Sequence, residues 1–528
     1  MPKASPLISL LCLIVFATSH AKANIVENNY AISIYDMGKL ISHEHYLLNI
    51  LQNFTDLLQE KVDTIENYLE MMNYEEDVKP PNNAVEYFRL IRRLHLDYFN
   101  WVWFLEQQPW EVLVAHIIAI APHMPSVKDI REATRAIRLI QIVYSLPTDK
   151  MVAGILMDVH YNASLNPMEC YTIANELFKD REYEAAMEWL SSGVDMYNAD
   201  TDKEELYTQL GVPLSNFYEL FVKIQDAQGK RGYALTELKT AMKTWPEQVS
   251  FRRAHSRLKM NIRIDKEPNT KKARPEYVYA HCCSHECRPT SKLFCLYNST
   301  TSSFLRLAPL KMELLSLDPY VVLYHDVVTE EDVERIKILA QDDLTRATTV
   351  HEDQVLREDP YRTTKAKWLD DTDEVMQRVS RLIQDMTNFD LNGSDMFQVM
   401  NYGIGGFYGN HYDFLRNSKS PKNFVDRIAT TMFYLSDVPL GGATAFPVLK
   451  LSVFPKKGSA LMWYNLHHSG EGDKRTFHSA CPTIVGSRWG KKSTKNKVSS
   501  IYLLYFTVMT RWIGEIQQLF RRPCLTHI

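Results

Sequence analysis

Two histidines and one aspartate in the C-terminal half have the types and spacing of a mononuclear iron site. His411 and Asp413 stand two positions apart after a glycine-rich turn, and His478 follows in a later strand-like stretch. Side chains two positions apart on a β-strand point to the same face, so the first two would converge on one point. With a third ligand from a distant strand they form a two-histidine, one-carboxylate face, which suits ferrous iron and leaves positions open for a cosubstrate and oxygen.

The His-x-Asp spacing by itself is a weak signal, because it occurs twice more in the chain. His95 and Asp97 lie in a helical pattern, where side chains two positions apart diverge, and the pair beginning at His351 opens a charged loop. His411 differs because a strand-like run, residues 428–435, follows it. Taken alone, the spacing leaves both a metal site and a structural role open.

Seven further motifs follow one another around these residues: Tyr434-Leu-Ser-Asp437, Gly441-Gly-Ala-Thr-Ala-Phe-Pro447, Pro455-Lys-Lys-Gly458, Trp463-Tyr-Asn-Leu466, Ser469-Gly-Glu-Gly-Asp473, His478-Ser-Ala-Cys-Pro482 and Phe520-Arg-Arg-Pro-Cys524. With them, the chain from about residue 318 onward resembles the catalytic domain of collagen prolyl 4-hydroxylase alpha subunits. The resemblance implies a double-stranded β-helix (jelly-roll) and a 2-oxoglutarate-dependent dioxygenase. Its reaction would be hydroxylation of proline in X-Pro-Gly repeats of procollagen-like polypeptides, with decarboxylation of 2-oxoglutarate to succinate.

The resemblance also implies cosubstrates and the residues that hold them. The three metal ligands would bind Fe(II), 2-oxoglutarate would chelate two of the remaining positions, and O2 would take the last. The far carboxylate of 2-oxoglutarate needs a cation, and where the family has a lysine this chain has Arg488, whose planar fork suits a carboxylate. Tyr402 and Thr444 are predicted hydroxyl donors to that carboxylate. L-Ascorbate would rescue iron that is oxidised in uncoupled cycles.

Two departures from the family pattern bear on activity. Gly514 stands where the family has a histidine that assists cosubstrate handling, which predicts weaker turnover. Residues 490–510 form a lysine-rich and then apolar segment that the family lacks, and we interpret it as a retained intron or an error in the predicted gene. A second function therefore stays open, a non-catalytic proline-rich-peptide-binding or chaperone subunit inactivated by the insertion. A third is a related luminal hydroxylase of other proline-rich proteins.

Composition and the N-terminal stretch predict a globular protein that enters the secretory pathway. Charged residues are 23% and hydrophobic residues 45% of the 528-residue chain, which predicts two to four globular domains. A net charge of -4 gives no global basic field, so no nucleic-acid partner is expected. Residues 1–23 read as a signal peptide, and no later apolar stretch approaches the roughly 20 residues needed to span a bilayer.

The predicted compartment is the lumen of the endoplasmic reticulum. Four glycosylation sequons fit that location: Asn53, Asn162, Asn298 and Asn392. The chain shows no KDEL-type retention signal, so a partner would have to retain it. The family resemblance implies protein disulfide isomerase, as the beta subunit of an alpha2beta2 tetramer.

Seven cysteines remain after the signal peptide, an odd number that leaves at least one unpaired. Four of them lie close together, at Cys282, Cys283, Cys287 and Cys295. Their spacing fits no standard zinc frame, which favours a disulfide from one of the first three to the fourth. The family resemblance implies that bridge, expected as Cys283–Cys295, and a second one, Cys481–Cys524.

The first half of the chain is predicted to be helical, with an N-terminal and dimerisation domain at residues 24–144. Apolar residues there follow alternating four- and three-residue steps, interrupted by Lys61: Leu47, Leu51, Phe54, Leu58, Ile65, Tyr68 and Met72. The pattern fits a coiled-coil seam or a helix that packs within its own domain. The family's alpha subunits pair through this region, which favours self-association.

Residues 145–250 predict short helix pairs with the small-residue spacing of tetratricopeptide (TPR) hairpins. In the family this region binds the proline-rich peptide, and aromatic rings suit a preformed polyproline II ligand. The candidate contacts are Tyr183, Trp189, Tyr197, Phe217, Tyr218 and Phe221; the alternative is that most are core residues. A linker with the cysteine cluster, 251–317, would join this domain to the catalytic domain, 318–528. The expected architecture is α+β, with helices first and the jelly-roll second.

Overall fold

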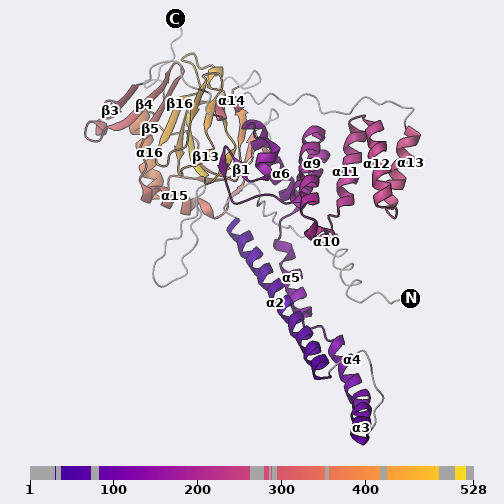
Figure 1. Cartoon of the computed structure of the whole chain (residues 1–528). Coiled ribbons are helices and arrows are strands. Elements are labelled where there is room, and N and C mark those ends of the chain that lie inside the picture. The colour runs from indigo at the N-terminus through magenta and orange to yellow at the C-terminus, as the bar shows by residue number, and fades with distance from the viewer. Residues whose placement is uncertain are drawn as a thin grey trace. The chain divides into compact units, whose positions relative to one another are not determined.

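A computed structural model describes residue 30 and residues 37–72, 83–261, 279–284, 287, 294–350, 356–416, 425–486 and 506–518. The chain divides into two compact units, with the main division in the sequence between Pro125 and Ser126 and with residues 29–35 assigned to the second unit. The first is a set of helices, and the second combines further helices with β-sheets (Figure 1). The expected α+β architecture, helical first and sheet-rich second, is confirmed.

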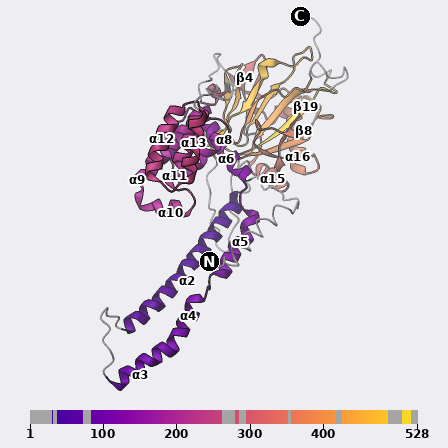
Figure 2. The same ribbon diagram turned by 90° about the vertical axis from the view of Figure 1, so that its right-hand side faces the viewer.

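The N-terminal unit is built on one long helix that pairs with shorter ones. Its helices are α2 (Met37–Met71), α3 (Ala84–Arg92), α4 (Tyr98–Glu106) and α5 (Glu111–Ile120), with a π-helical turn (Arg93–Asp97) between α3 and α4 (Figure 2). Aromatic contacts join α2 to α4 and to the start of α5. The ring centres of Phe54 and Trp110 are 5.5 Å apart, and those of Tyr68 and Trp101 are 4.8 Å apart. The predicted helix is therefore present, and one of its faces packs within its own unit.

Lys61 does not interrupt this packing. Its ammonium donates to the carbonyl oxygens of Leu105 (3.1 Å) and Gln107 (2.7 Å), at the end of α4. It also lies 5.3 Å from the ring centre of Phe104 and 5.2 Å from that of Trp110. A cation at the carboxyl end of a helix satisfies carbonyls that have no partner within the helix and complements the helix dipole.

Eight helices open the second unit: α6 (Val127–Val143), α7 (Thr148–Val152), α8 (Pro167–Lys179), α9 (Tyr183–Ala199), α10 (Glu204–Gln209), α11 (Leu214–Ala227), α12 (Arg231–Thr244) and α13 (Val249–Asn261). The pairs α8–α9 and α11–α12 pack closely, as the small residues predict. A Cβ on Gly193 would lie 2.9 Å from the ring of Phe217, so the helices approach closely there. A short hairpin, β1 (Ile155–Leu156) and β2 (Val159–His160), follows α7.

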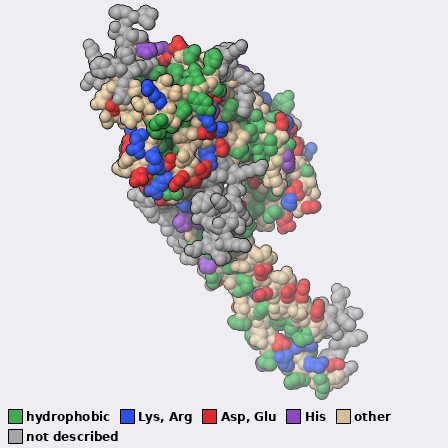
Figure 3. Space-filling view, turned by 90° about the vertical axis from the view of Figure 1, so that its left-hand side faces the viewer, with side chains coloured by type: hydrophobic (Ala, Val, Ile, Leu, Met, Phe, Trp, Pro, Cys, Tyr) green, Lys and Arg blue, Asp and Glu red, His purple; other side chains and the backbone are tan. Residues whose placement is uncertain are grey.

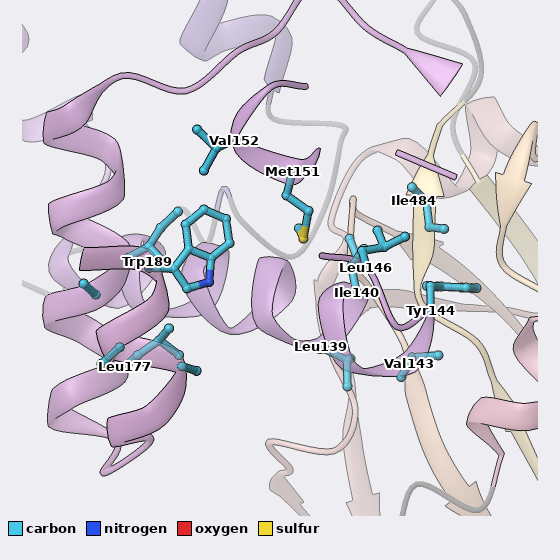
Figure 4. Close-up of a cluster of buried hydrophobic side chains, with 14 of the residues drawn as sticks. Leu139, Ile140, Val143, Tyr144, Leu146, Met151, Val152, Leu177, Trp189 and Ile484 are labelled. Carbon is cyan, nitrogen blue, oxygen red and sulfur yellow. The ribbon is translucent and has the colours of Figure 1, made fainter. Parts of the chain in front are cut away.

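The predicted domain boundary at residue 144 is misplaced. Helix α6 begins at a capping box on Ser126 and shares one hydrophobic core with α8 and α9. Figure 4 shows Leu139, Ile140 and Val143 of α6 in this core, with Trp189 of α9 and Ile484 of the β-region nearby. Because its apolar face is buried there, α6 belongs to the second unit.

The rest of the second unit is a sandwich of sheets. The major sheet has the order β3-β4-β5-β16-β12-β19-β10-β9-β6, and the facing minor sheet has the order β11-β17-β14-β15. Major-sheet bounds are β3 (Phe294–Asn298), β4 (Leu310–Leu317), β5 (Tyr320–His325), β6 (Thr345–Arg346), β9 (Lys365–Leu369), β10 (Phe397–Tyr402), β12 (Arg427–Tyr434), β16 (Ala460–Tyr464) and β19 (Phe506–Gly514). Minor-sheet bounds are β11 (Tyr408–His411), β14 (Thr444–Phe446), β15 (Leu451–Val453) and β17 (His478–Ala480).

Two cores hold the sandwich together. One joins the two sheets, with Met432 and Trp463 from the major sheet and Phe446 from the minor sheet. The other packs the opposite face of the major sheet against α15 (Glu330–Gln341) and α16 (Glu374–Thr387). Two small sheets of two strands each complete the fold. One pairs β7 (Thr348–Val350) with β8 (Leu356–Glu358), and the other pairs β13 (Leu440–Gly441) with β18 (Thr483–Val485). This is the arrangement expected of a jelly-roll.

Two further sequence predictions need correction. The linker predicted at 251–317 contains α13, which packs on α12, and strands β3 and β4, which extend the major sheet. The segment interpreted as an insertion, 490–510, ends inside β19, where Met509 is fully buried between β12 and β10. Residues 506–510 are therefore part of the sheet, and residues 490–505 lie outside the described ranges.

The cysteine pairing also differs from the prediction. Cys282 is bonded to Cys287, and Cys283 of the short helix α14 (Ala280–Cys283) is bonded to Cys481. Cys283–Cys295 is therefore wrong, because α14 packs against β14 and β15, which brings Cys283 to the minor sheet. Cys481 already has a partner, so Cys481–Cys524 is not formed; Cys524 itself lies outside the described residues. Cys170 and Cys295 are unpaired within the described ranges.

Three of the four sequon asparagines are exposed, at Asn53, Asn162 and Asn392. Asn298 is only 6% exposed, and its Oδ1 accepts hydrogen bonds from Thr300 and Thr301. Asn298 is therefore the least exposed of the four, and glycosylation at all four positions stays a prediction. No single helix within the described ranges is long and apolar enough to cross a membrane; one bent pair, 84–123 with 127–143, passes by length and composition only.

Candidate active site

The minor sheet brings the three predicted metal ligands together. His411 of β11 and His478 of β17 are cross-strand partners, and Asp413 follows β11 directly. Their ligand atoms all lie within 4.8 Å of one another. His411 Nε2 is 3.5 Å from Oδ1 of Asp413, and His478 Nε2 is 3.8 Å from its Oδ2. Two imidazoles and one carboxylate around a single point fit an octahedral ferrous ion with open positions.

Hydrogen bonds fix the orientation of each ligand. Nδ1 of His411 lies 2.9 Å from the carbonyl oxygen of Gly409, and Nδ1 of His478 lies 2.9 Å from that of Thr476. A carbonyl can only accept, so each Nδ1 carries the proton and each Nε2 keeps its lone pair for a metal. Thr430 of β12 donates to Oδ2 of Asp413 at 2.7 Å, which holds the carboxylate in place.

Burial and mutual proximity set the protonation states that metal binding requires. Burial and the neighbouring His411 lower the pKa of His478 to about 4, so its imidazole is neutral at physiological pH. Burial alone would raise the pKa of Asp413, but the two histidines and Thr430 outweigh it and hold that pKa well below its usual range. Neutral imidazoles with an ionised carboxylate are the forms that coordinate a metal ion.

Aromatic rings pack around the ligands. The Tyr408 ring stacks on His411 at 3.6 Å between centres, and His478 lies 4.9 Å from Trp463 and 5.4 Å from Phe446. Asn465 donates to Thr430, which in turn holds Asp413. Trp463 packs in the core between the sheets, as the sequence indicates.

A cavity of about 590 Å³ opens onto His411 and Asp413. Three arginines and two tryptophans line it: Arg346, Arg362, Arg427, Trp368 and Trp512. Arg427 lies over the Trp512 ring at 4.1 Å and pairs with Asp395, which is outside the cavity lining.

Arg362 carries a buried positive charge at this cavity. It is 6% exposed and lies over the Tyr408 ring at 4.7 Å. Its guanidinium donates to two neutral oxygens, the carbonyl of Thr348 and Oε1 of Gln398, each at 2.8 Å. Within the described residues no carboxylate neutralises it, so the cavity favours an anion or carbonyl oxygens at this wall.

The predicted hydroxyl donors lie in the interior between the sheets. Thr444 and Tyr402 are both buried, and Thr444 shares a 2.7 Å hydrogen bond with the hydroxyl of Tyr434. Burial raises the pKa of Tyr402 to about 12, so it stays a neutral donor. Arg488, the predicted cation, lies outside the described residues.

The peptide-binding candidates have a different position from the one predicted. Trp189 and Phe217 are fully buried, and Tyr183 and Tyr197 are nearly so, all within the helical core. Tyr218 and Phe221 are only partly buried. Four of the six are therefore core residues, because the helix pairs need large rings between small residues to fill the space.

Sequence reasoning missed several residues that shape the site. Thr430, Tyr434, Arg362 and Arg427 all lie far from the iron ligands in sequence, and each acts through a cross-strand or cross-sheet contact. Thr430 stands in the strand-like run 428–435, but nothing in the sequence says which face it occupies.

The fold and the site define a 2-oxoglutarate and Fe(II)-dependent oxygenase, and residues 397–492 match the 2OG-Fe(II) oxygenase superfamily. Residues 33–158 match the N-terminal region of prolyl 4-hydroxylase alpha subunits. The chain is 30% identical over 539 residues to prolyl 4-hydroxylase subunit alpha-1 of Rattus norvegicus, covering 93% of this chain and 95% of the relative.

Two other prolyl 4-hydroxylase alpha subunits match nearly the whole chain at similar identity. The chain is 28% identical over 561 residues to subunit alpha-2 of Gallus gallus, covering 97% of this chain and 98% of the relative. It is 29% identical over 561 residues to subunit alpha-3 of Bos taurus, covering 99% of each chain. The chain belongs to the prolyl 4-hydroxylase alpha-subunit family.

Proposed function

We propose that this chain hydroxylates proline in X-Pro-Gly repeats of procollagen-like polypeptides and converts 2-oxoglutarate to succinate. The observation that carries the proposal is the cavity at His411 and Asp413, large enough for a prolyl residue and walled by aromatic rings. Bound Fe(II), with 2-oxoglutarate and O2, supplies the oxidant for a C–H bond. L-Ascorbate would restore iron that is oxidised in uncoupled cycles.

The chain's own groups bind, orient and shield the reactants. His411, His478 and Asp413 would hold the ion on one face, leaving the cavity side open. The hydroxyls of Tyr402 and Thr444, with Arg488, are the groups we assign to the far carboxylate of 2-oxoglutarate. The ring of Trp368, which is 44% exposed at this cavity, offers an apolar surface to a proline ring, and Arg362 has the charge to bind carbonyl oxygens or a carboxylate.

The test is formation of succinate and hydroxyproline on a Pro-Pro-Gly repeat peptide, with protein disulfide isomerase co-expressed. Three variants run alongside: His411→Ala, a matched control His325→Ala on β5, and a deletion of residues 490–505, which leaves strand β19 intact. Activity that His411→Ala abolishes and His325→Ala keeps supports the proposal. Activity only in the deletion variant would mean that the segment blocks an otherwise competent site.

The rival function is a non-catalytic subunit that binds proline-rich peptides. If neither succinate nor hydroxyproline formed with the unmodified chain or any variant, while a known active enzyme worked in parallel, the result would favour this binding function over catalysis. Preference for other proline-rich proteins over Pro-Pro-Gly repeats would instead favour a related hydroxylase with a different substrate.

Self-association through α2 is the second part of the proposal. Beside the face that packs on α4 and α5, the helix carries apolar residues at heptad spacing, each 39–55% exposed: Leu48, Leu51, Leu58, Val62 and Leu69. Such a stripe fits the seam of a coiled coil with a second copy. Figure 3 shows further hydrophobic side chains on the surface of this unit.

We also propose residence in the lumen of the endoplasmic reticulum, behind a signal peptide at residues 1–23 and with protein disulfide isomerase as a partner. Two disulfides and exposed sequons at Asn53, Asn162 and Asn392 support an oxidising, glycosylating compartment. Sensitivity of the expressed protein to endoglycosidase, with co-purification of the isomerase, tests this location.

A further inference from the structure

A second cavity, of about 370 Å³, adjoins the one at the iron ligands. It lies between helix α6 and the loop 404–407 that precedes β11. Arg346 and Tyr361 line both cavities. The backbone carbonyl of Tyr361 accepts a 2.8 Å hydrogen bond from Gly409, two residues before His411. The second cavity is thus a neighbour of the reaction cavity on the side of the helices, and Arg346 and Tyr361 form their common wall.

The junction that forms this cavity is tightly built. Gly405 has a φ of +70°, and a Cβ there would lie 2.4 Å from the Cβ of Ala136 on α6. Its amide donates to the carbonyl of Thr483 at 2.7 Å, which anchors the loop to β18. Only glycine tolerates both the close approach and this backbone conformation without strain. The wall positions of the cavity are therefore fixed by direct backbone packing.

The lining combines an unused acceptor with apolar walls. Glu132 of α6 pairs with Arg346 through Oε1, while its Oε2 is buried and accepts no hydrogen bond within the described residues. A buried carboxylate oxygen without a donor is costly, so it indicates a group that arrives from outside. The apolar part of the wall includes Leu139, Ile142, Pro360, Ile404 and Phe407, and two ion pairs, Arg135–Asp180 and Arg138–Glu182, border it.

We propose that this second cavity is an exosite for the substrate polypeptide, binding residues that flank the proline under reaction. The inference rests on the proposed function. A polyproline II chain has no internal hydrogen bonds, so the N–H groups of its non-proline residues are free. One such N–H would satisfy Oε2 of Glu132, while proline rings lie against the apolar wall. In this proposal one extended chain passes over Tyr361, which is 50% exposed and borders both cavities, and so occupies both.

The test fills the second cavity without touching the first. Ile404 is 38% exposed and lines only the second cavity, so Ile404→Trp should fill it without disturbing the core. We expect the KM for a long Pro-Pro-Gly repeat peptide to rise about tenfold, or about 1.4 kcal/mol. The kcat, the KM for 2-oxoglutarate and the KM for a peptide with a single X-Pro-Gly triplet should stay unchanged.

Val448→Trp is the matched control, since Val448 is 56% exposed and lines neither cavity. Ile404→Ala, which widens the cavity, should change the same KM by less. An equal rise for long and short peptides, or no rise with either, would overturn the exosite while leaving the catalytic proposal intact.

Absence of hydroxylation in the unmodified chain would instead remove the catalytic proposal. The exosite would then be decided by binding alone, with a fluorescent long Pro-Pro-Gly peptide. Weaker binding by Ile404→Trp than by Val448→Trp supports the exosite, and equal binding by the two variants refutes it.

Discussion

The N-terminal unit and the oxygenase sandwich bury their apolar residues to very different degrees. Helices α3, α4 and α5 contain no fully buried residue, and α2 has only Ile50. In the sandwich, the central strand β12 buries seven of its eight residues. The sandwich can account for its own stability, whereas the N-terminal unit leaves an apolar surface that association would cover. The two proposals, catalysis and self-association, therefore concern separate parts of one chain.

The largest effect is expected in the sandwich. His411→Ala should remove one of three metal ligands and reduce succinate formation to background, while the oligomeric state stays as in the unmodified chain. A succinate assay after anaerobic loading with iron measures the activity, the iron content measures the loss of the ligand, and sedimentation velocity measures the oligomeric state. Loss of assembly in this variant would show that the two regions depend on each other.

The reciprocal change lies in the N-terminal unit. Leu51→Lys with Leu58→Lys places two charges on the exposed stripe of α2, so the self-associated form should dissociate into single alpha subunits. Turnover of a single-triplet peptide should persist, because both residues belong to the N-terminal unit and the iron ligands belong to the other unit. The paired control is Gln52→Lys with Gln59→Lys, at exposed neighbouring positions of the same helix. An unchanged mass for the leucine variant in sedimentation would refute the seam.

A smaller effect is expected from the residue that orients the carboxylate. Thr430→Val keeps the shape of the side chain but removes the 2.7 Å hydrogen bond to Asp413. Losing such a supporting contact should weaken iron affinity about 10- to 100-fold. Excess Fe(II) should restore much of the activity, and Thr431→Val, beside it on β12, is the matched control. Failure of iron to rescue activity would point to a general loss of packing.

The smallest effect concerns Lys61 of α2, whose ammonium lies at the carboxyl end of α4. Lys61→Met should lose two hydrogen bonds and the contacts with Phe104 and Trp110, at a cost of about 1–2 kcal/mol. Amide hydrogen exchange over residues 98–110 should then accelerate about tenfold, with no change in the sandwich. Lys39→Met, at the start of the same helix, is the control.

Sequence reasoning worked best where the signal was local. The His-x-Asp pair, the glycine-rich turn before it and the helical periodicity of residues 40–72 all describe neighbouring positions, and the structure follows them. The two faces of α2 were not predictable, because periodicity cannot tell which apolar stripe packs on α4 and α5 and which remains exposed.

The failures came from contacts between distant positions. Pairing of Cys283 with Cys481 depends on α14 packing against the minor sheet, which cysteine spacing cannot express. Likewise, Trp189 and Phe217 have the aromatic character of a peptide-binding face, but their burial is decided by neighbouring helices. The role of Thr430 could be seen only once the face of β12 that is turned toward Asp413 was known.

The order of strands in the major sheet has a consequence for synthesis. Strand β19, the last to be translated, lies in the middle, paired with β12 on one side and β10 on the other. A ribosome must therefore release almost the whole chain before the sheet can close, and until then both neighbours present unpaired backbone edges. A premature stop codon before residue 506 would leave those edges permanently open. Such truncated products should aggregate or be degraded, even though every iron ligand had already been translated.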